Sequence, residues 1–402
     1  MDIRKLCFCF ILAFSLLLRP VTASEEEEVF DPEPWEAAEA LSSVEDVASR
    51  VGAAVLMERE TGTCLFEHRA HERLSPASVT KIMTMLLVCE ALDGGGLTED
   101  TTVRCSAHAA GMGGSQIFLK EGEAMGVGDL LKSVAVASAN DAAVALAEAV
   151  AGSEGEFVKR MNARAEELGM ADTRFANCTG LPSEEEHLTS AWDIALMSRA
   201  LLGHERIRAY TSIWTDSIRD GAFGLANTNK LVRFYEGCTG LKTGFTQEAM
   251  YCLAASARRD GTEYIAVVLH AETSAERFEA ARLLLDHAFA LWQLVDALPD
   301  GALPPVAVEL GKEKYIQPAM GGETKLLLKK TEAAALRKEL ELPERLEAPV
   351  AAGQTLGTLR LLDGEGRELL RLPVIAPEGV ERLGWGRVFL LCLQALVTGQ
   401  IP

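Results

Sequence analysis

Residues 74–84 of the chain have the sequence LSPASVTKIMT. Pro76 and the apolar residues that recur every three or four positions after it predict a helix that runs toward Leu92. Ser78 and Lys81 then lie one turn apart on one face, so a hydroxyl and an amine can meet. A lysine accepts a proton from serine only if desolvation and neighbouring cations lower its pKa. Because Ser-x-x-Lys also occurs on exposed helices, a nucleophile with its base and an ordinary surface pair both remain open at this point.

Two further short motifs contain residues that suit peptide chemistry. Ser138-Ala139-Asn140 lies between two predicted helices. It is either a capping turn, or a site at which Ser138 passes on a proton and Asn140 orients a substrate amide. Lys242-Thr243-Gly244 lies on a predicted strand. Its lysine is either a solvated edge residue, or it attracts a carboxylate that Thr243 also binds while Gly244 leaves room for an extended chain.

The three motifs occur in order, with 60 residues from Ser78 to Ser138 and 102 from Asn140 to Lys242. This is the trio of penicillin-binding proteins and class A β-lactamases, with alanine where the usual middle motif has aspartate. The chain therefore resembles a low-molecular-mass penicillin-binding protein, a serine-type D-alanyl-D-alanine carboxypeptidase of the peptidase S11 type. The resemblance covers nearly the whole mature length, and its most specific stretches are residues 74–84, 136–143, 176–182 and 240–246.

The resemblance implies a role for each motif residue. Ser78 is the acylated nucleophile, Lys81 its general base, and Ser138 with Asn140 the second catalytic element. The substrate-binding residues are Lys242, Thr243, Gly244 and Phe245. The backbone N–H groups of Ser78 and Phe245 form the oxyanion hole. Some family members have histidine at position 245, which leaves the details of deacylation open. Arg277 is a weak candidate for a second group that meets the substrate carboxylate, and neither a metal nor an organic cofactor is implied.

The order of predicted elements indicates the α/β (α+β) class with an antiparallel sheet flanked by helices. A strand pair is predicted at 53–57 and 64–67, helices follow, and three strands at 241–245, 251–257 and 264–270 precede a helix at 275–292. The resemblance assigns this part the penicillin-binding/serine β-lactamase-like transpeptidase fold. Proline-rich residues after 298 mark a boundary, beyond which short strands at 306–310, 324–330, 356–362 and 367–374 predict a small β-rich domain.

The expected domain boundaries follow from these patterns. They are a signal peptide at 1–23, an acidic linker at 24–34, a DD-peptidase domain at 35–298, a β-rich C-terminal domain at 303–378 and an amphipathic segment at 380–402. Trp385, Phe389, Cys392 and Leu396 recur at helical spacing, which fits either a membrane-surface helix or a packed one. The resemblance favours a membrane anchor. The predicted location is the outer face of the bacterial cytoplasmic membrane, with peripheral attachment.

Composition and cysteine spacing argue against several classes of function and site. The net charge of −20 provides no broad basic surface, so nucleic-acid binding is not expected. Seven scattered cysteines remain after the signal peptide, an odd number without C-x-x-C spacing that argues against a disulfide framework or a zinc site. The predicted activity is removal of the terminal D-alanine from peptidoglycan stem peptides ending in D-Ala-D-Ala, with β-lactams as inhibitors.

Three alternatives stay open beside this activity. The chain could be a DD-transpeptidase or endopeptidase of the same family, in which an amine rather than water resolves the acyl-enzyme or the cleaved bond lies in a cross-link. It could also be a penicillin-binding sensor without turnover. A β-lactamase is disfavoured, because no Glu-x-x-Leu-Asn segment lies between Asn140 and Lys242 and the C-terminal domain is unexpected for one.

Overall fold

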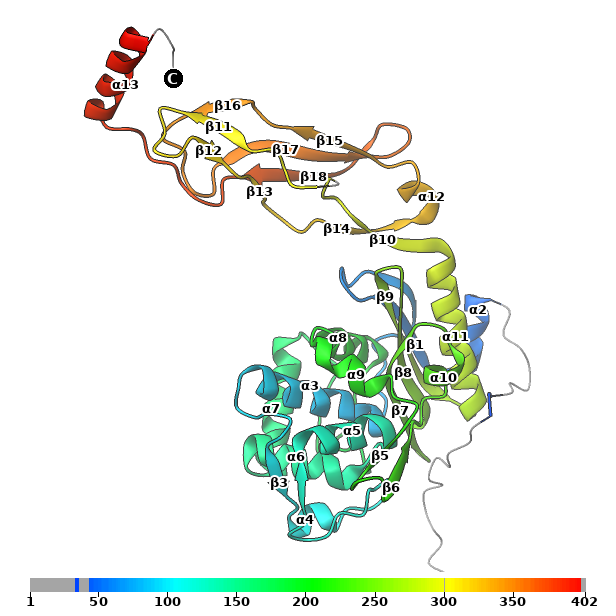
Figure 1. Cartoon of the computed structure of the whole chain (residues 1–402). Coiled ribbons are helices and arrows are strands. Elements are labelled where there is room, and N and C mark those ends of the chain that lie inside the picture. The colour runs from blue at the N-terminus through cyan, green and yellow to red at the C-terminus, as the bar shows by residue number, and fades with distance from the viewer. Residues whose placement is uncertain (1–32, 36–42, 300, 399–402) are drawn as a thin grey trace, which may run out of the picture. The chain divides into compact units, whose positions relative to one another are not determined.

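The computed structural model of the chain describes residues 33–35, 43–299 and 301–398 (Figure 1). These residues form two compact units that divide between Ala288 and Phe289. The predicted signal peptide, residues 1–23, and most of the acidic linker lie outside the described residues.

A five-stranded antiparallel sheet, in the order β2-β1-β9-β8-β7, forms the centre of the first unit. Its strands are β1 (Ala53–Glu58), β2 (Cys64–His68), β7 (Cys238–Thr246), β8 (Met250–Arg259) and β9 (Thr262–Ala271). All six residues of β1, nine of the ten in β9 and six of the ten in β8 are buried, because helices cover both faces of the sheet (Figure 1). The predicted antiparallel sheet is confirmed, and β7 lies at its edge.

Helices α2 and α11 lie on one face of this sheet and the remaining helical layer lies on the other (Figure 1). The longer helices are α2 (Val44–Arg50), α3 (Lys81–Asp93), α5 (Val127–Ala137), α6 (Asn140–Ala151), α7 (Glu154–Glu167), α8 (Ala191–Leu201) and α11 (Ser274–Leu291). The short ones are α4 (Ala107–Ala110), α9 (Arg208–Thr211), α10 (Leu231–Phe234), η1 (Ala77–Thr80) and η2 (Glu205–Ile207). Helix α3 is buried at 10 of its 13 residues, as a helix that is apolar on nearly every side should be.

The start of the predicted helix after Pro76 differs from the expectation. Residues 77–80 form the 3-10 turn η1, and the α-helix begins only at Lys81. Side chains three positions apart eclipse each other in a 3-10 turn, so Ser78 is held directly over Lys81.

Two pairs of short strands lie beside the helical layer. Strands β3 (Thr102–Arg104) and β4 (Ala124–Gly126) enclose a loop at 105–123, and β5 (Thr215–Ile218) with β6 (Phe223–Ala226) form a hairpin. Strands of three or four residues are too short to show a two-residue period, which is why the sequence does not predict them.

The second unit is rich in β-structure. Its sheets have the orders β12-β11-β16, β13-β18-β17-β15 and β10-β14. The strands are β10 (Trp292–Asp296), β11 (Val306–Glu309), β12 (Tyr315–Ile316), β13 (Ala319–Met320), β14 (Lys325–Lys329), β15 (Arg337–Glu341), β16 (Arg345–Glu347), β17 (Thr355–Leu362) and β18 (Glu368–Ile375), with a short helix α12 (Lys330–Ala333). Two small hydrophobic clusters fill this unit, which agrees with the predicted β-rich domain.

Helix α13 (Trp385–Thr398) ends the described chain. Its large apolar side chains are exposed, with Trp385 at 90%, Phe389 at 65% and Leu396 at 85%. No helix among residues 43–299 and 301–398 is both long and apolar enough to cross a bilayer.

Candidate active site

Ser78 and Lys81 form a close pair at the junction of η1 and α3. Lys81 Nζ lies 2.8 Å from Ser78 Oγ and donates to the backbone carbonyl of Thr179 at 2.8 Å. The residue before the serine, Ala77, has a φ of +46°, a left-handed conformation that only the surrounding structure can impose on alanine. The exposed surface pair that the sequence left open is excluded, because Lys81 is fully buried.

Burial lowers the pKa of Lys81 well below its ordinary value, and the nearby charge of Lys242 lowers it further. Cys178 and, to a smaller extent, Asp141 oppose this shift. A neutral amine at this position can accept the proton of Ser78, which is the requirement for activating a serine.

The loop at residues 176–182 packs against the turn η1, which carries Ser78. Asn177 Oδ1 accepts the backbone N–H of Gly180 at 2.7 Å, and Gly180 adopts a φ of +83°. A Cβ at Gly180 would lie 1.8 Å from the carbonyl oxygen of Ala77, so only glycine fits there. The loop thereby holds both the turn before Ser78 and the Thr179 carbonyl that Lys81 contacts.

Ser138 and Asn140 lie where α5 ends and α6 begins. Ser138 caps α5 in a left-handed conformation with a φ of +61°, and both residues are buried. Asn140 Nδ2 donates to the Gly113 carbonyl at 2.7 Å, which fixes the orientation of the amide. Its Oδ1 is buried without a hydrogen-bond partner among the described residues. A buried acceptor left unpaired is costly, so this oxygen is free for a ligand N–H.

Strand β7 places the Lys242-Thr243-Gly244 motif next to the turn that carries Ser78. A Cβ at Gly244 would lie 2.8 Å from the Pro76 carbonyl oxygen and 3.0 Å from the backbone nitrogen of Ser78. The expected close approach of another backbone at Gly244 is therefore present. Phe245, whose backbone N–H is the second expected donor of the oxyanion hole, is the next residue of β7.

Lys242 is 1% exposed, which excludes a solvated edge lysine. Its Nζ donates to the carbonyl of Thr243 at 2.9 Å. Burial lowers the pKa of Lys242 to about 7, so an incoming anion would stabilise its charged form. Thr243 Oγ1 donates to Thr228 Oγ1 at 2.6 Å, which ties β7 to the segment after β6.

Arg277 lies behind β7, where a ligand cannot reach its side chain. Its guanidinium is 1% exposed and donates to the carbonyls of Gly244 and Cys252 at 3.2 and 3.3 Å. Burial lowers its pKa to about 9. The arginine supports the backbone on which the Lys-Thr-Gly motif stands.

Several residues at the site carry no sequence signal of their own. Asp141 is fully buried and accepts the backbone N–H groups of Ile117 and Leu119 at 3.2 and 2.9 Å, which ties a distant loop to Asn140. His187 Nδ1 accepts the N–H of Ala176 at 3.0 Å, so its Nε2–H donates to Thr80 Oγ1 at 2.8 Å. These contacts join segments far apart in sequence, and only the folded chain reveals them.

The structure thus brings the three motifs to one place. A serine beside an amine of lowered pKa, an unpaired amide oxygen and a buried lysine come from the η1–α3 junction, the turn between α5 and α6, and the edge strand β7. Such an arrangement can attack a carbonyl carbon, hold the adjacent amide and bind a carboxylate.

Comparison with known proteins identifies relatives of both units. Residues 39–273 match the peptidase S11 family, described as D-alanyl-D-alanine carboxypeptidase, and residues 296–382 match the C-terminal domain of penicillin-binding protein 5. The D-alanyl-D-alanine carboxypeptidase DacF of Bacillus subtilis is 45% identical over 345 residues, which cover 85% of this chain and 88% of the relative.

Two solved structures are also similar. Penicillin-binding protein 6B of Escherichia coli superposes with a TM-score of 0.66 at 30% identity, covering 87% of this chain and 99% of that one. Penicillin-binding protein D2 of Listeria monocytogenes, solved in an ampicillin-bound form, has a TM-score of 0.52 at 33% identity and covers 60% of this chain and 97% of that one.

Proposed function

The chain belongs to the peptidase S11 family of D-alanyl-D-alanine carboxypeptidases and is a hydrolase, and we propose that its Ser78 removes the terminal D-alanine of peptidoglycan stem peptides through an acyl-enzyme. The observation that carries the assignment of the nucleophile is the fully buried amine of Lys81, 2.8 Å from Ser78 Oγ and with a lowered pKa. No step of this proposed reaction needs a metal or an organic cofactor.

In acylation, Ser78 gives its proton to Lys81 and Oγ bonds to the carbonyl carbon of the penultimate D-alanine. The negative charge that develops on the carbonyl oxygen is stabilised by the backbone N–H groups of Ser78 and Phe245. The intermediate then expels D-alanine, whose amine takes the proton from Lys81 through Ser138. Water hydrolyses the resulting ester and regenerates Ser78.

Two groups position the substrate. Lys242 and Thr243 bind the terminal carboxylate, and the unpaired Oδ1 of Asn140 accepts an amide N–H of the peptide. Gly244 allows the substrate backbone to lie along the edge of β7, as an added strand. A β-lactam enters the same site, but its opened ring keeps the leaving amine attached, so the acyl-enzyme persists.

We also propose the domain organisation and location that the sequence suggests. Residues 1–23 direct export, residues 35–298 carry the reaction, residues 303–378 form an accessory domain, and α13 attaches the protein to the outer face of the cytoplasmic membrane. The exposed apolar side chains of α13 support the attachment.

The test uses the purified chain with a peptide that ends in D-Ala-D-Ala. Free D-alanine is measured by chromatography, and the intact mass is recorded with and without penicillin, beside a Ser78→Ala control. We expect D-alanine release and a penicilloyl adduct on the peptide containing Ser78, both lost in the control. An adduct without release would indicate a transpeptidase or a sensor. Release that survives in Ser78→Ala would refute the nucleophile.

A further inference from the structure

A buried arginine lies directly behind the strand of the Lys-Thr-Gly motif. Arg277, near the start of α11, is 1% exposed, and its Nη1 donates to the backbone carbonyls of Gly244 in β7 and Cys252 in β8. These two residues are partners in the β7–β8 register. Taking a guanidinium out of water costs free energy, and an apolar side chain of similar size would fill the space without that cost. Packing of α11 against the sheet alone therefore does not call for an arginine here.

The Gly244 carbonyl belongs to the same peptide group as the N–H of Phe245. This peptide bond is trans, so its C=O and its N–H point in opposite directions. The carbonyl shares its donor with the carbonyl of Cys252 and so faces β8, whereas β7 is the outermost strand of the sheet. The N–H of Phe245 therefore points to the free edge of β7, where a donor of the oxyanion hole is expected.

A hydrogen bond to a peptide carbonyl also changes the N–H on the other side of the group. It draws electron density toward the oxygen, which increases the double-bond character of the C–N bond and makes the N–H a stronger donor. A charged donor has a larger effect than a neutral one. Burial lowers the pKa of Arg277 only to about 9, so the guanidinium is charged at pH 7. Arg277 thus both fixes the plane of this peptide group and strengthens its N–H.

Aromatic side chains hold the guanidinium in place. Its carbon lies 4.7 Å from the ring centroid of Phe278 and 5.3 Å from that of Tyr251, and Nη2 donates to Ser274 Oγ at 3.2 Å. The ring of Tyr251 also packs against the ring of Phe245, at a centroid distance of 4.4 Å. Phe245 is therefore connected to Arg277 through its side chain as well as through its backbone.

We propose that Arg277 is a positioning residue that holds the Gly244–Phe245 peptide group in the orientation in which the Phe245 N–H stabilises the oxyanion. The inference rests on the proposed function. Arg277 touches neither the substrate nor Ser78, and it acts only through Phe245. Because the carbonyl oxygen carries more negative charge in the transition state than in the initial complex, loss of Arg277 should slow acylation more than it weakens the binding of penicillin.

The test compares Arg277→Met and Arg277→Lys with the wild type in the full chain. Methionine keeps the apolar packing but cannot donate a hydrogen bond, whereas lysine keeps a charge and a donor. Stopped-flow kinetics over a range of penicillin concentrations give the acylation rate constant and the dissociation constant of the initial complex. Infrared difference spectra, recorded with penicillin labelled with carbon-13 at the β-lactam carbonyl, give the stretching frequency of the ester carbonyl in the acyl-enzyme.

We expect Arg277→Met to slow acylation about tenfold or more and to change the dissociation constant by less than about twofold. The ester carbonyl stretch should move to higher wavenumber, because weaker hydrogen bonds in the oxyanion hole leave more double-bond character in the carbonyl. Arg277→Lys should show part of each change. Lost stability lowers the amount of adduct but does not alter its frequency, so the spectrum separates positioning from a merely structural role.

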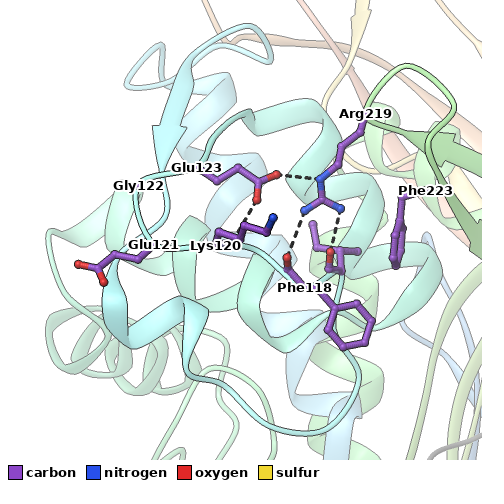
Figure 2. A pocket seen from close by; sticks show the side chains of 8 residues that line it. Phe118, Lys120, Glu121, Gly122, Glu123, Arg219 and Phe223 are labelled. Carbon is purple, nitrogen blue, oxygen red and sulfur yellow. Dashed lines mark hydrogen bonds and ion pairs between the residues drawn. The ribbon is translucent and has the colours of Figure 1, made fainter.

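Arg219→Met is the matched control. Arg219 also donates to two backbone carbonyls, those of Ile117 and Phe118 at 2.8 and 3.5 Å, and its guanidinium carbon lies 5.5 Å from the ring centroid of Phe223. Figure 2 shows Arg219 beside Phe118 and Phe223. These contacts resemble those of Arg277 but lie outside the Lys-Thr-Gly strand. Arg219→Met should therefore keep the wild-type carbonyl stretch.

A carbonyl stretch in Arg277→Met equal to that of the wild type would overturn the proposal, even if acylation were slower. An equal shift in Arg219→Met would overturn it too, because the change would then not be specific to Arg277. If Arg277→Met does not fold, Arg277→Lys decides in the same way, since its single nitrogen cannot reproduce the geometry of the guanidinium. No adduct on the wild type would instead refute the proposed function, and this inference with it.

Discussion

Two buried lysines with opposite protonation requirements control the proposed chemistry. Lys81 must be neutral to take the proton of Ser78, whereas Lys242 must be charged to hold a carboxylate. Burial lowers the pKa of both, and the charge of Lys242 adds to the shift at Lys81. Because this charge is a second cause that lowers only the pKa of Lys81, we expect Lys81 to lose its proton first, which leaves a pH window in which both conditions are met.

The two titrations predict a bell-shaped profile of kcat/KM against pH. Activity should rise as Lys81 loses its proton and fall as Lys242 loses its own, with the alkaline limb near the Lys242 pKa of about 7. Arginine stays charged through this range, so Lys242→Arg should move the alkaline limb upward by more than about one pH unit, at some cost in rate. Steady-state kinetics from pH 5 to about 10 test this. An alkaline limb that stays in place would mean that another group titrates there.

His187 offers a test of stability that is separate from catalysis. Burial lowers the pKa of His187 to about 4, from an ordinary value of 6.5. Between those values the unfolded chain binds a proton that the folded chain does not, so the free energy of unfolding falls as pH falls through this window. His187→Phe should remove this part of the pH dependence and cost about 1–3 kcal/mol at pH 7, because the N–H of Ala176 and the hydroxyl of Thr80 lose their partner.

Urea unfolding at pH 7 and at pH 5 measures both effects. An equal change in the free energy of unfolding between pH 7 and pH 5 in the wild type and in His187→Phe would show that folding does not lower the pKa of His187.

The sequence predicts the catalytic and binding residues of the three motifs, but few of the residues that contact them. Ser78, Lys81, Asn140 and Lys242 could be found because their spacing matches a known pattern. The Thr179 carbonyl, Thr228 and Asp141 act through contacts across 98, 15 and 22–24 residues, and threonine or aspartate alone gives no sign of them. Arg277 was a weak candidate for the carboxylate, and its burial behind β7 could not be inferred from its position in a helix.

Among the secondary-structure elements, the contact between β7 and η1 determines the width of the site. Gly244→Ala would place a Cβ 2.8 Å from the Pro76 carbonyl oxygen, so either the strand or the nucleophile turn must move. A displacement of this kind should lower the rate of acylation by penicillin about a hundredfold. Gly155→Ala in α7 is the matched control, because its Cβ meets no atom within 4 Å.

Stopped-flow acylation with a fluorescent penicillin measures the rate for each variant. The Gly155→Ala rate should equal that of the wild type, with stability unchanged or higher by less than about 1 kcal/mol. A Gly244→Ala rate within a factor of about two of the wild type would show that the turn yields without loss of geometry.

Periodicity predicts the long elements well and their junctions poorly. The strands of the central sheet and helix α11 are predicted to within a few residues. The helix predicted after Pro76 begins instead as η1, and the helix predicted to reach residue 292 ends at Leu291, because β10 starts at Trp292. Such boundaries depend on tertiary contacts, here the Gly180 loop and the pairing of β10 with β14, that no local pattern encodes.

At the scale of the whole molecule, we expect the first unit to carry out the reaction and the second unit to hold the protein at its location. All motif residues lie in the first unit, and α13 lies in the second. The exposed side chains of Trp385, Phe389 and Leu396 have no apolar cover, which is unfavourable in water and favourable at a lipid interface.

Membrane attachment through α13 predicts that one face of this helix carries the binding energy. Phe389→Glu should abolish co-sedimentation with phospholipid vesicles, because burial of a phenylalanine contributes about 1.5–3 kcal/mol and a carboxylate opposes insertion. Gln394→Glu adds the same charge on the other face and should weaken binding much less. D-Alanine release from a soluble peptide should be unchanged in both variants, since neither residue belongs to the catalytic unit. Equal losses of vesicle binding would point to charge alone, and equal retention would mean that α13 packs against protein instead of lipid.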